Sequence, residues 1–84
     1  MHIMGLSKQL KFTFRGKSIQ RPLIYEVGHK FNVTTNIRKA DVESDGGWVI
    51  LELTGSKEEI NKALDWLKKE EVRIDNVAGD IVAG

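Results

Sequence analysis

The chain has 84 residues, which is enough for one small domain and too few for two. It contains no cysteine, and this excludes a disulfide framework, a thiol nucleophile and any zinc or iron–sulfur site ligated by cysteines of this chain. Its 13 basic and 12 acidic residues give a net charge of +1, whereas proteins that bind nucleic acid are usually far more basic.

The ends of the chain and its hydropathy predict a cytoplasmic protein. No apolar run reaches the ~20 residues of a membrane-spanning helix, so direct membrane insertion is not expected. The segment Met1–Gly5 is too short and too weakly charged for a secretory signal. His2 and His29 are the only histidines, and no paired carboxylates stand at ligand spacing, so we expect neither a metal site nor a cofactor.

The first predicted strand is followed by a predicted helix. Leu10–Arg15 alternates apolar and polar residues, which is typical of a half-buried strand. Pro22 suits the first turn of a helix, where its missing N–H is not needed. Leu23, Val27 and Phe31 recur at four-residue spacing, so a helix is expected from about Pro22 to Phe31.

A β-hairpin is predicted next. Val33–Glu43 is rich in β-branched residues and predicts a strand. Its apolar positions change parity partway, which predicts a bulge near Arg38 and Lys39. The turn signal Asp45–Gly47 and the apolar run Trp48–Leu53 then complete the hairpin.

The second helix has the clearest sequence signal. Ser56 and Glu59 match a capping box, in which the Ser56 hydroxyl accepts from the Glu59 N–H and the Glu59 carboxylate reaches back. Apolar residues follow at helical spacing through Leu67. Val72–Asp75 alternates again and predicts the last strand.

The predicted element order is βαββαβ. Strand–helix–strand units favour right-handed crossovers, and two such halves around a central hairpin give the ferredoxin-like split βαβ fold. The fold class is therefore α+β, with a four-stranded antiparallel sheet and both helices on one face. The other face, called the open face below, is left without a covering layer.

The open face is expected to make a dimer interface. Val49, Leu51 and Leu53 should point to the helices, and Trp48 and Ile50 should point outward. Scattered surface apolar residues are common, and that is the alternative interpretation. We favour a contact with a second copy, because a small domain is short of buried surface.

Catalytic and nucleic-acid-binding patterns are missing from the sequence. No Ser/His/Asp arrangement, phosphate-binding loop or dinucleotide glycine pattern is present, so no enzyme activity is expected. Phe12 and Phe14 share the parity that faces the helices, which leaves Trp48 as the outward aromatic residue. A base-stacking surface needs aromatic residues on the open face, so nucleic acid is not an expected partner.

One ordered set of motifs resembles a known family. The stretch Pro22–Ile24, then His29–Ile37, and later Leu51–Gly55 followed by the second helix, is similar to the NIL domain. That family is named for an Asn-Ile-Leu motif in its second strand. Asn36 and Ile37 match the motif here, and Arg38 replaces the leucine. The similarity divides the chain into an N-terminal extension (1–9), the NIL-like domain (10–77) and a C-terminal tail (78–84).

The resemblance implies a regulatory role. The family has the βαββαβ fold, is related to ACT-type amino-acid-sensing domains, and occurs at the C-terminus of methionine-import ABC transporter ATPases, where it dimerises and binds methionine. It also precedes iron–sulfur ferredoxin modules. Neither the ATPase nor the cluster cysteines are present here, so the chain is expected to be a free-standing relative or an excised domain.

The resemblance also implies a site. Asn36 falls at the position tied to methionine binding, and an amide can donate to a carboxylate and accept from an ammonium group. Asn36 could instead bond backbone at a bulged strand. Ile37 would supply an apolar contact or belong to the core. Arg38 could pair with a ligand carboxylate, or could spoil an apolar thioether pocket.

Two functions follow as hypotheses. The first is a homodimeric module that binds a methionine-like amino acid in a cleft between its subunits. The second is an interaction domain that docks on a transporter or iron–sulfur protein and has no small-molecule ligand. Ligand binding by the isolated chain discriminates between them.

Overall fold

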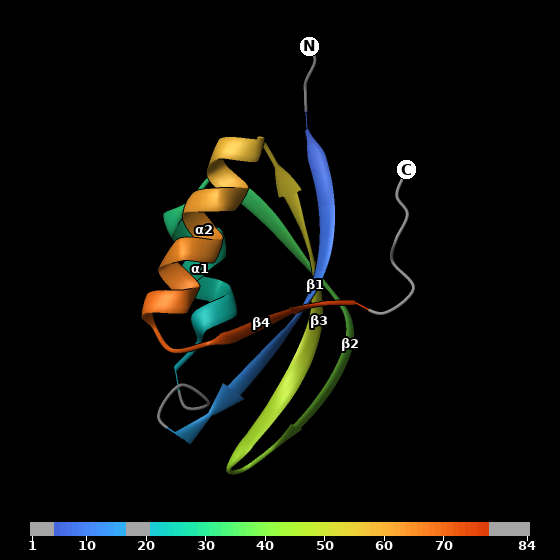
Figure 1. Cartoon of the computed structure of the whole chain (residues 1–84), viewed down its shortest axis with the longest axis vertical. Helices are drawn as coiled ribbons and strands as arrows, with labels where there is room; N and C mark the ends of the chain where they lie inside the picture. Colours follow the sequence, from blue (N-terminus) through green and yellow to red (C-terminus); the bar gives the residue numbers. More distant parts are fainter. Residues whose placement is uncertain (1–4, 17–20, 78–84) are drawn as a thin grey trace.

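The computed structural model describes residues 5–16 and 21–77, which form four strands and two helices in the predicted order (Figure 1). The elements are β1 (Leu6–Arg15), α1 (Leu23–Lys30), β2 (Val33–Glu43), β3 (Gly46–Gly55), α2 (Lys57–Lys69) and β4 (Arg73–Asn76). The strands form one antiparallel sheet in the order β2-β3-β1-β4, and both helices lie on one side of it. The predicted ferredoxin-like α+β fold is confirmed.

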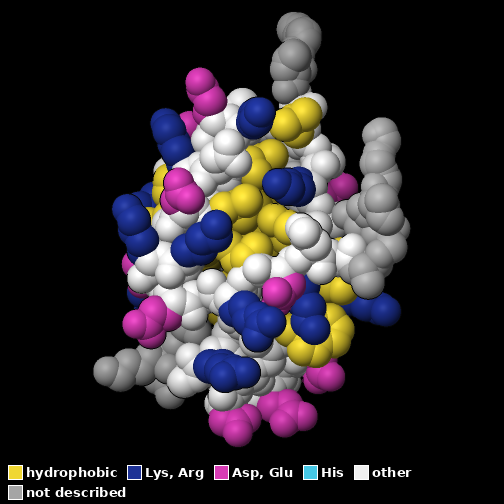
Figure 2. All heavy atoms as spheres, viewed as in Figure 1, with side chains coloured by type: hydrophobic (Ala, Val, Ile, Leu, Met, Phe, Trp, Pro, Cys, Tyr) yellow, Lys and Arg dark blue, Asp and Glu magenta, His cyan; other side chains and the backbone are white. Residues whose placement is uncertain are grey.

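The core lies between the helices and the sheet, as the alternation predicts. Inward residues of β1 and β3, including Phe12, Leu51 and Leu53, are almost completely buried. Leu23 and Val27 of α1 and the apolar stripe of α2 pack against them. Burial of each large apolar side chain contributes about 1.5–3 kcal/mol, so this layer is the main source of stability. Figure 2 shows hydrophobic side chains at the surface beside α2, among Lys and Arg side chains.

Several strand boundaries differ from the prediction, and β3 runs over Gly46–Gly55 rather than Trp48–Leu53. β1 begins at Leu6 rather than Leu10, because its first residues pair with the end of β3 from Leu53 to Gly55. Main-chain pairing of this kind needs no alternation of side chains, so the sequence pattern does not reveal it. β4 begins at Arg73, and Val72 before it is buried against the core.

The predicted bulge in β2 is confirmed. The register between β2 and β3 shifts between Ile37 and Lys39, so Arg38 is the extra residue.

A close main-chain contact between β3 and β2 explains the glycine at position 47 of β3. A Cβ at Gly47 would lie 2.6 Å from the Asp41 carbonyl oxygen, which is too close for any larger residue without a shift of the backbone.

The caps of α2 differ in one detail from the prediction. The Ser56 Oγ accepts from the Glu59 N–H at 3.1 Å, as expected. The Glu59 carboxylate does not reach back to Ser56. Its Oε1 accepts instead from the Asn32 backbone N–H at 2.9 Å, and its Oε2 pairs with Lys62. Glu59 therefore ties the α1–β2 connection to α2.

Candidate functional site

The alternation of side chains along β2 places two of the three predicted ligand-binding residues on the open face. Asn36 is exposed, and its Cα partner on β3 is Glu52. Glu52 alternates with the buried Leu51 and Leu53, so it points to the open face. Arg38 Nη1 lies 3.7 Å from Glu52 Oε1, which puts the Arg38 side chain on the same face. Asn36, Glu52 and Arg38 thus form a polar cluster, called the β2 cluster below.

Ile37 does not join the β2 cluster. Its Cα partner is Leu51, whose side chain is buried beneath the helices, so Ile37 lies on the helix side of the sheet. It is 54% exposed there, because β2 is at the edge of the sheet. The strand therefore separates Asn36 and Ile37 onto opposite faces, as the alternation of side chains requires.

The predicted outward residues Trp48 and Ile50 are partly exposed on the open face. Their Cα partners on β2 are Asp41 and Lys39. Lys11 of β1 places its Nζ 5.1 Å from the centre of the Trp48 ring, within the range of a cation–π contact. The apolar pair is therefore small and is bordered by charged side chains, with the β2 cluster next to it along β3.

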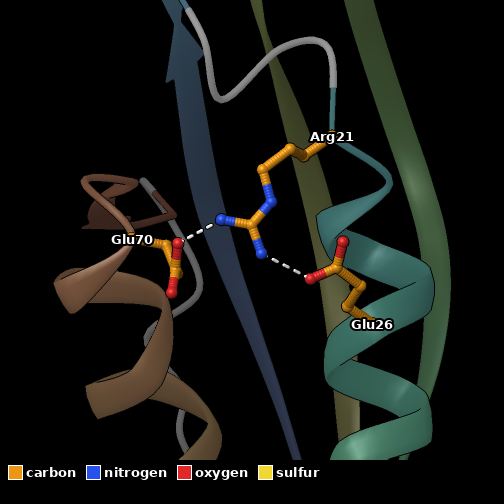
Figure 3. A network of polar contacts seen from close by, with 3 residues as sticks. All are labelled: Arg21, Glu26 and Glu70. Carbon is orange, nitrogen blue, oxygen red and sulfur yellow. Dashed lines mark hydrogen bonds and ion pairs between the residues drawn. The ribbon is translucent and has the colours of Figure 1, made fainter.

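An arginine outside the predicted site connects the two helices (Figure 3). Arg21 precedes α1, and its Nη2 donates to Glu26 Oε1 at 2.6 Å. Its Nη1 donates to Glu70 Oε1 at the end of α2. The hydrogen bonds to Glu26 and then Glu70 raise the pKa of the Arg21 guanidinium above its usual value. Both carboxylates thus accept hydrogen bonds from the same guanidinium group. The network connects the start of α1 to the end of α2.

The β2–β3 hairpin extends past the start of α1 (Figure 1). A cleft lies there on the helix side of the sheet. Its volume is about 320 Å³, and Phe14, Val42 and Val49 of the sheet face Pro22–Tyr25 across it. The lining is mostly apolar. Because Val42 lies on the helix side of β2, the sheet separates this cleft from the β2 cluster.

A second, smaller cleft of about 240 Å³ lies between the helices. Tyr25 and His29 stack in it with ring centres 5.5 Å apart, and Lys30 lies 5.9 Å from the centre of the Trp66 ring. Its aromatic residues are therefore already paired with residues of the same chain.

Two structural features are absent from residues 5–16 and 21–77, a metal-ligand cluster and a membrane-spanning helix. No group of three or more His, Asp or Glu side chains in this part could hold a metal ion. None of its helices is long and apolar enough to cross a membrane.

Sequence reasoning missed Glu52 as a member of the site. The alternation of β3 places Glu52 outward, but which β2 residue it meets depends on the register across the bulge. It missed the Arg21 network for a similar reason, since Arg21 and Glu70 are far apart in the sequence. The only local signal is the i, i+5 spacing of Arg21 and Glu26, which is not a recurrent pairing distance in helices.

Comparison with known proteins places the fold in a family. The family model of the NIL domain matches residues 8–76. The methionine import ATP-binding protein MetN 1 of Salmonella typhimurium (strain LT2) is 33% identical over 70 residues, and the methionine import ATP-binding protein MetN of Escherichia coli (strain K12) is 30% identical over 70 residues. Each alignment covers 79% of this chain and 20% of the relative, so this chain spans about a fifth of the length of these relatives.

A solved structure shows the same fold. The C-terminal domain of an ABC transporter ATP-binding protein from Enterococcus faecalis superimposes with a TM-score of 0.73, over 87% of this chain and 86% of that one, at 19% identity. The match of the family model covers most of the chain, including the motif residues Asn36 and Ile37. The chain therefore belongs to the NIL domain family.

Proposed function

We propose that this NIL domain is a non-catalytic regulatory module that binds a small amino acid, methionine or one similar to it. The observation that carries the proposal is the β2 cluster, in which Arg38 and Glu52 present opposite charges 3.7 Å apart beside Asn36. A free α-amino acid carries one negative and one positive group on neighbouring atoms. The cluster offers a matching partner for each.

The roles of the cluster residues follow from their chemistry. The Arg38 guanidinium would bind the ligand carboxylate, since charge-assisted hydrogen bonds of this kind are strong. Glu52 would accept from the ligand ammonium group, and the Asn36 amide can serve either group. The ligand would divide the existing Arg38–Glu52 pair. This pair is long for an ion pair, at 3.7 Å, and its side chains are 51% and 25% exposed, so little is lost when it opens.

A second copy would complete the site. Trp48 and Ile50 lie next to Glu52 on the same face and would take the apolar side chain of the ligand. An open sheet offers contacts on one side only, whereas a binding site encloses most of its ligand. A second copy over Trp48 and Ile50 would supply the other wall, and a symmetric pair uses the same patch twice. Ile37 would contribute only from the sheet edge.

The host would be an ABC transporter. The relatives that this chain matches are named as methionine import ATP-binding proteins. A transporter subunit that binds ATP would act on the cytoplasmic side, where ATP is available. A small domain that binds the transported amino acid can couple its concentration to the rate of import. On this proposal the chain acts in the cytoplasm, on or beside a transporter ATPase.

A thermal shift series over the amino acids tests the proposal. A ligand at 100 times its Kd stabilises a protein by about 2.7 kcal/mol, which is a shift of several degrees for a domain of this size. We expect a shift with methionine or a similar apolar amino acid. No shift with any amino acid would overturn the proposal and favour a purely protein-binding domain.

A further inference from the structure

The edge of the sheet beside β1 is only partly covered. β1 has 10 residues, whereas β4 has only 4 and pairs with residues 10–13 of β1. Residues 6–9, called the free segment of β1 below, pair with β3 on one side. Within residues 5–16 and 21–77, no strand pairs with them on the other side. A free edge of this kind presents main-chain N–H and C=O groups that attract another extended segment.

The helix side of this region carries apolar side chains that are not fully covered. Leu6 is 50% exposed, although it shares the parity of the buried Leu10. Trp66 packs against Phe31 of the α1–β2 connection, so helical spacing puts Leu64 on the opposite flank of α2, toward β4. Leu64 is only partly buried there. Hydrophobic side chains beside α2 are visible at the surface in Figure 2. An occupant of the free segment would therefore cover apolar surface as well as main-chain groups.

The chain itself continues toward this edge. β4 runs antiparallel to β1, and its last residue, Asn76, is the Cα partner of Leu10 at the end of the free segment. Val77 follows, and then residues 78–84, which lie outside the described residues. In an antiparallel pair, each further residue of one strand meets the preceding residue of the other. The register of any continuation is therefore set by β4, to which it is covalently joined.

We propose that residues 77–82 extend β4 along the free segment of β1, as an edge strand formed by the same chain. The register of β4 on β1, continued without a bulge, gives four new pairs of facing residues. These pairs are Gln9 with Val77, Lys8 with Ala78, Ser7 with Gly79 and Leu6 with Asp80. β4 then matches β1 in length, and the free main-chain groups of β1 gain partners.

The apolar residues of the extension suit the surface that they meet. Ile74 of β4 faces the helices, because its Cα partner is the buried Phe12. Side chains alternate along a strand, so Ala78 and Val82 fall on the same side as Ile74. Both are diagonal neighbours of Leu6 in the continued register, and such neighbours are close enough to make contact. The exposed Leu6 side chain is covered by this contact.

One charge pair also fits the continued register. Lys8 is exposed, and among the described residues it belongs to no ion pair. Asp80 is the only charged residue among residues 77–84. It falls on the helix side, as Lys8 does, and is its diagonal neighbour, which a long lysine side chain can reach. The single negative charge of the extension thus lies beside an unpaired positive charge of β1.

Other occupants of the free segment are at a disadvantage. A second copy or an unrelated protein must first be brought to the edge from solution. Residues 77–82 are held beside it by their link to β4, which gives them a high effective concentration there. Their pairing is also independent of the proposed function. β3 and β1 separate the extension from the β2 cluster, and neither a ligand nor a second subunit takes part in it.

Hydrogen exchange measured by NMR tests the pairing. In the full chain, the amides of residues 6–9 that do not donate to β3 should be protected at every protein concentration. Deletion of residues 78–84 should speed their exchange about tenfold or more, while the Phe12 amide, which lies between β3 and β4, should change little. Unprotected amides in the full chain would overturn the proposal. Protection that is lost on dilution would assign the edge to a second copy and would overturn it too.

Charge reversal tests the register with the same readout. Lys8→Glu and Asp80→Lys should each speed the exchange of these amides roughly threefold, as expected for an exposed charge pair. The double variant Lys8→Glu/Asp80→Lys should restore slow exchange. Lys68→Glu makes the same charge change on α2 and should have no effect. A double variant that exchanges as fast as the single variants would contradict the register.

A cysteine pair tests the register independently of charge. The chain has no cysteine, so Ser7→Cys/Gly79→Cys introduces two thiols that face each other in the continued register. Their Cα atoms lie within the range of a disulfide, and mild oxidation should link them within one chain. Ser7→Cys/Asp80→Cys places the two thiols on opposite faces and should link much less. Equal linking of the two pairs, or of neither, would overturn the proposal.

These experiments separate the strand extension from the proposed function. If the amides of residues 6–9 are protected while no amino acid shifts the melting temperature, the extension stands and amino-acid binding falls. If an amino acid stabilises the domain while these amides exchange freely, amino-acid binding stands and the extension is wrong.

Discussion

Asn36 of β2 faces Glu52 of β3, and Arg38 Nη1 lies 3.7 Å from the same carboxylate. Residues 36 and 38 share a face because side chains alternate along a strand. The bulge leaves Arg38 without a Cα partner on β3, since Lys39 takes the place opposite Ile50. Alternation and the register of β2 on β3 thus bring an amide, a cation and an anion together on the open face.

Asn36→Ala tests whether the motif asparagine binds ligand. Asn36 is exposed on the open face, so its removal should change the free energy of unfolding by no more than about 0.5 kcal/mol. The stabilisation by the amino acid should disappear. Thermal melts with and without ligand measure both quantities, with Asn61→Ala on α2 as the control. A variant that is unfolded without ligand would show that Asn36 is structural.

Trp48→Glu tests the contact on the open face. The substitution puts a carboxylate where a second copy would cover an apolar pair, so we expect sedimentation to show a weakened or lost open-face contact. Far-UV circular dichroism should be unchanged, because Trp48 is outside the core. Tyr25→Glu makes the same kind of change on the exposed helix side and should have no effect on association. A Trp48→Glu variant that associates like the wild type would contradict the contact.

Glu71→Gly should stabilise the domain. The end of α2 has the hydrogen bonds of a Schellman motif, in which Val72 N–H donates to the Leu67 carbonyl and Glu71 N–H donates to the Lys68 carbonyl. Glu71 occupies the left-handed position, with φ of 67°, where glycine is usual. Removing the Cβ should raise the free energy of unfolding by about 1 kcal/mol, which corresponds to roughly 4–8 °C in Tm.

Glu71→Ala is the matched control for this prediction. It removes the same charge but keeps the Cβ, so it should give little of the gain. Equal stabilisation by alanine and glycine would attribute the effect to charge rather than to the backbone.

Glu59→Gln should lose stability at neutral pH and lose little in acid. The Asn32 backbone N–H and then Lys62 stabilise the Glu59 carboxylate and lower its pKa below the usual value. A carboxyl group whose pKa is lowered by folding stabilises the fold above its unfolded pKa of about 4.3, and this contribution is lost as the pH falls through the folded pKa. Chemical denaturation from pH 7 to pH 2 should show the two proteins converging.

Glu58→Gln is the control for this pH dependence, because it makes the same charge change in the same turn of α2. Its stability difference from the wild type should vary less with pH than that of Glu59→Gln. If the two variants had the same pH profile, the bond from Asn32 would not be the cause.

The sequence predicts the parts of the fold that depend on local periodicity. Alternation in β1 and β3 assigns Phe12 and Leu51 to the core because burial of one sheet face imposes a period of two. The parity change in β2 predicts the bulge for the same reason. The start of β1 at Leu6 has no such signal, since main-chain hydrogen bonds to β3 hold its polar residues in the strand.

The site is less predictable than the fold. The family motif leads to Asn36, but motif neighbours in a strand point to opposite faces, and this removes Ile37 from the side where Asn36 lies. Glu52 belongs to the β2 cluster because of the register of β2 on β3. The Arg21 network, outside that cluster, depends on a contact with Glu70 at the far end of α2. Both depend on tertiary structure, which local residue patterns do not encode.

Calorimetric titration of the domain with methionine tests the central claim most directly. The account predicts a saturable heat of binding for methionine or a closely similar amino acid, and none for the analogues that lack either the ammonium or the carboxylate group, because Glu52 and Arg38 each need a charged partner. Asn36→Ala should abolish the heat. No saturable binding of any amino acid to the wild-type domain, or equal binding of the analogue that lacks the ammonium group, would contradict the account.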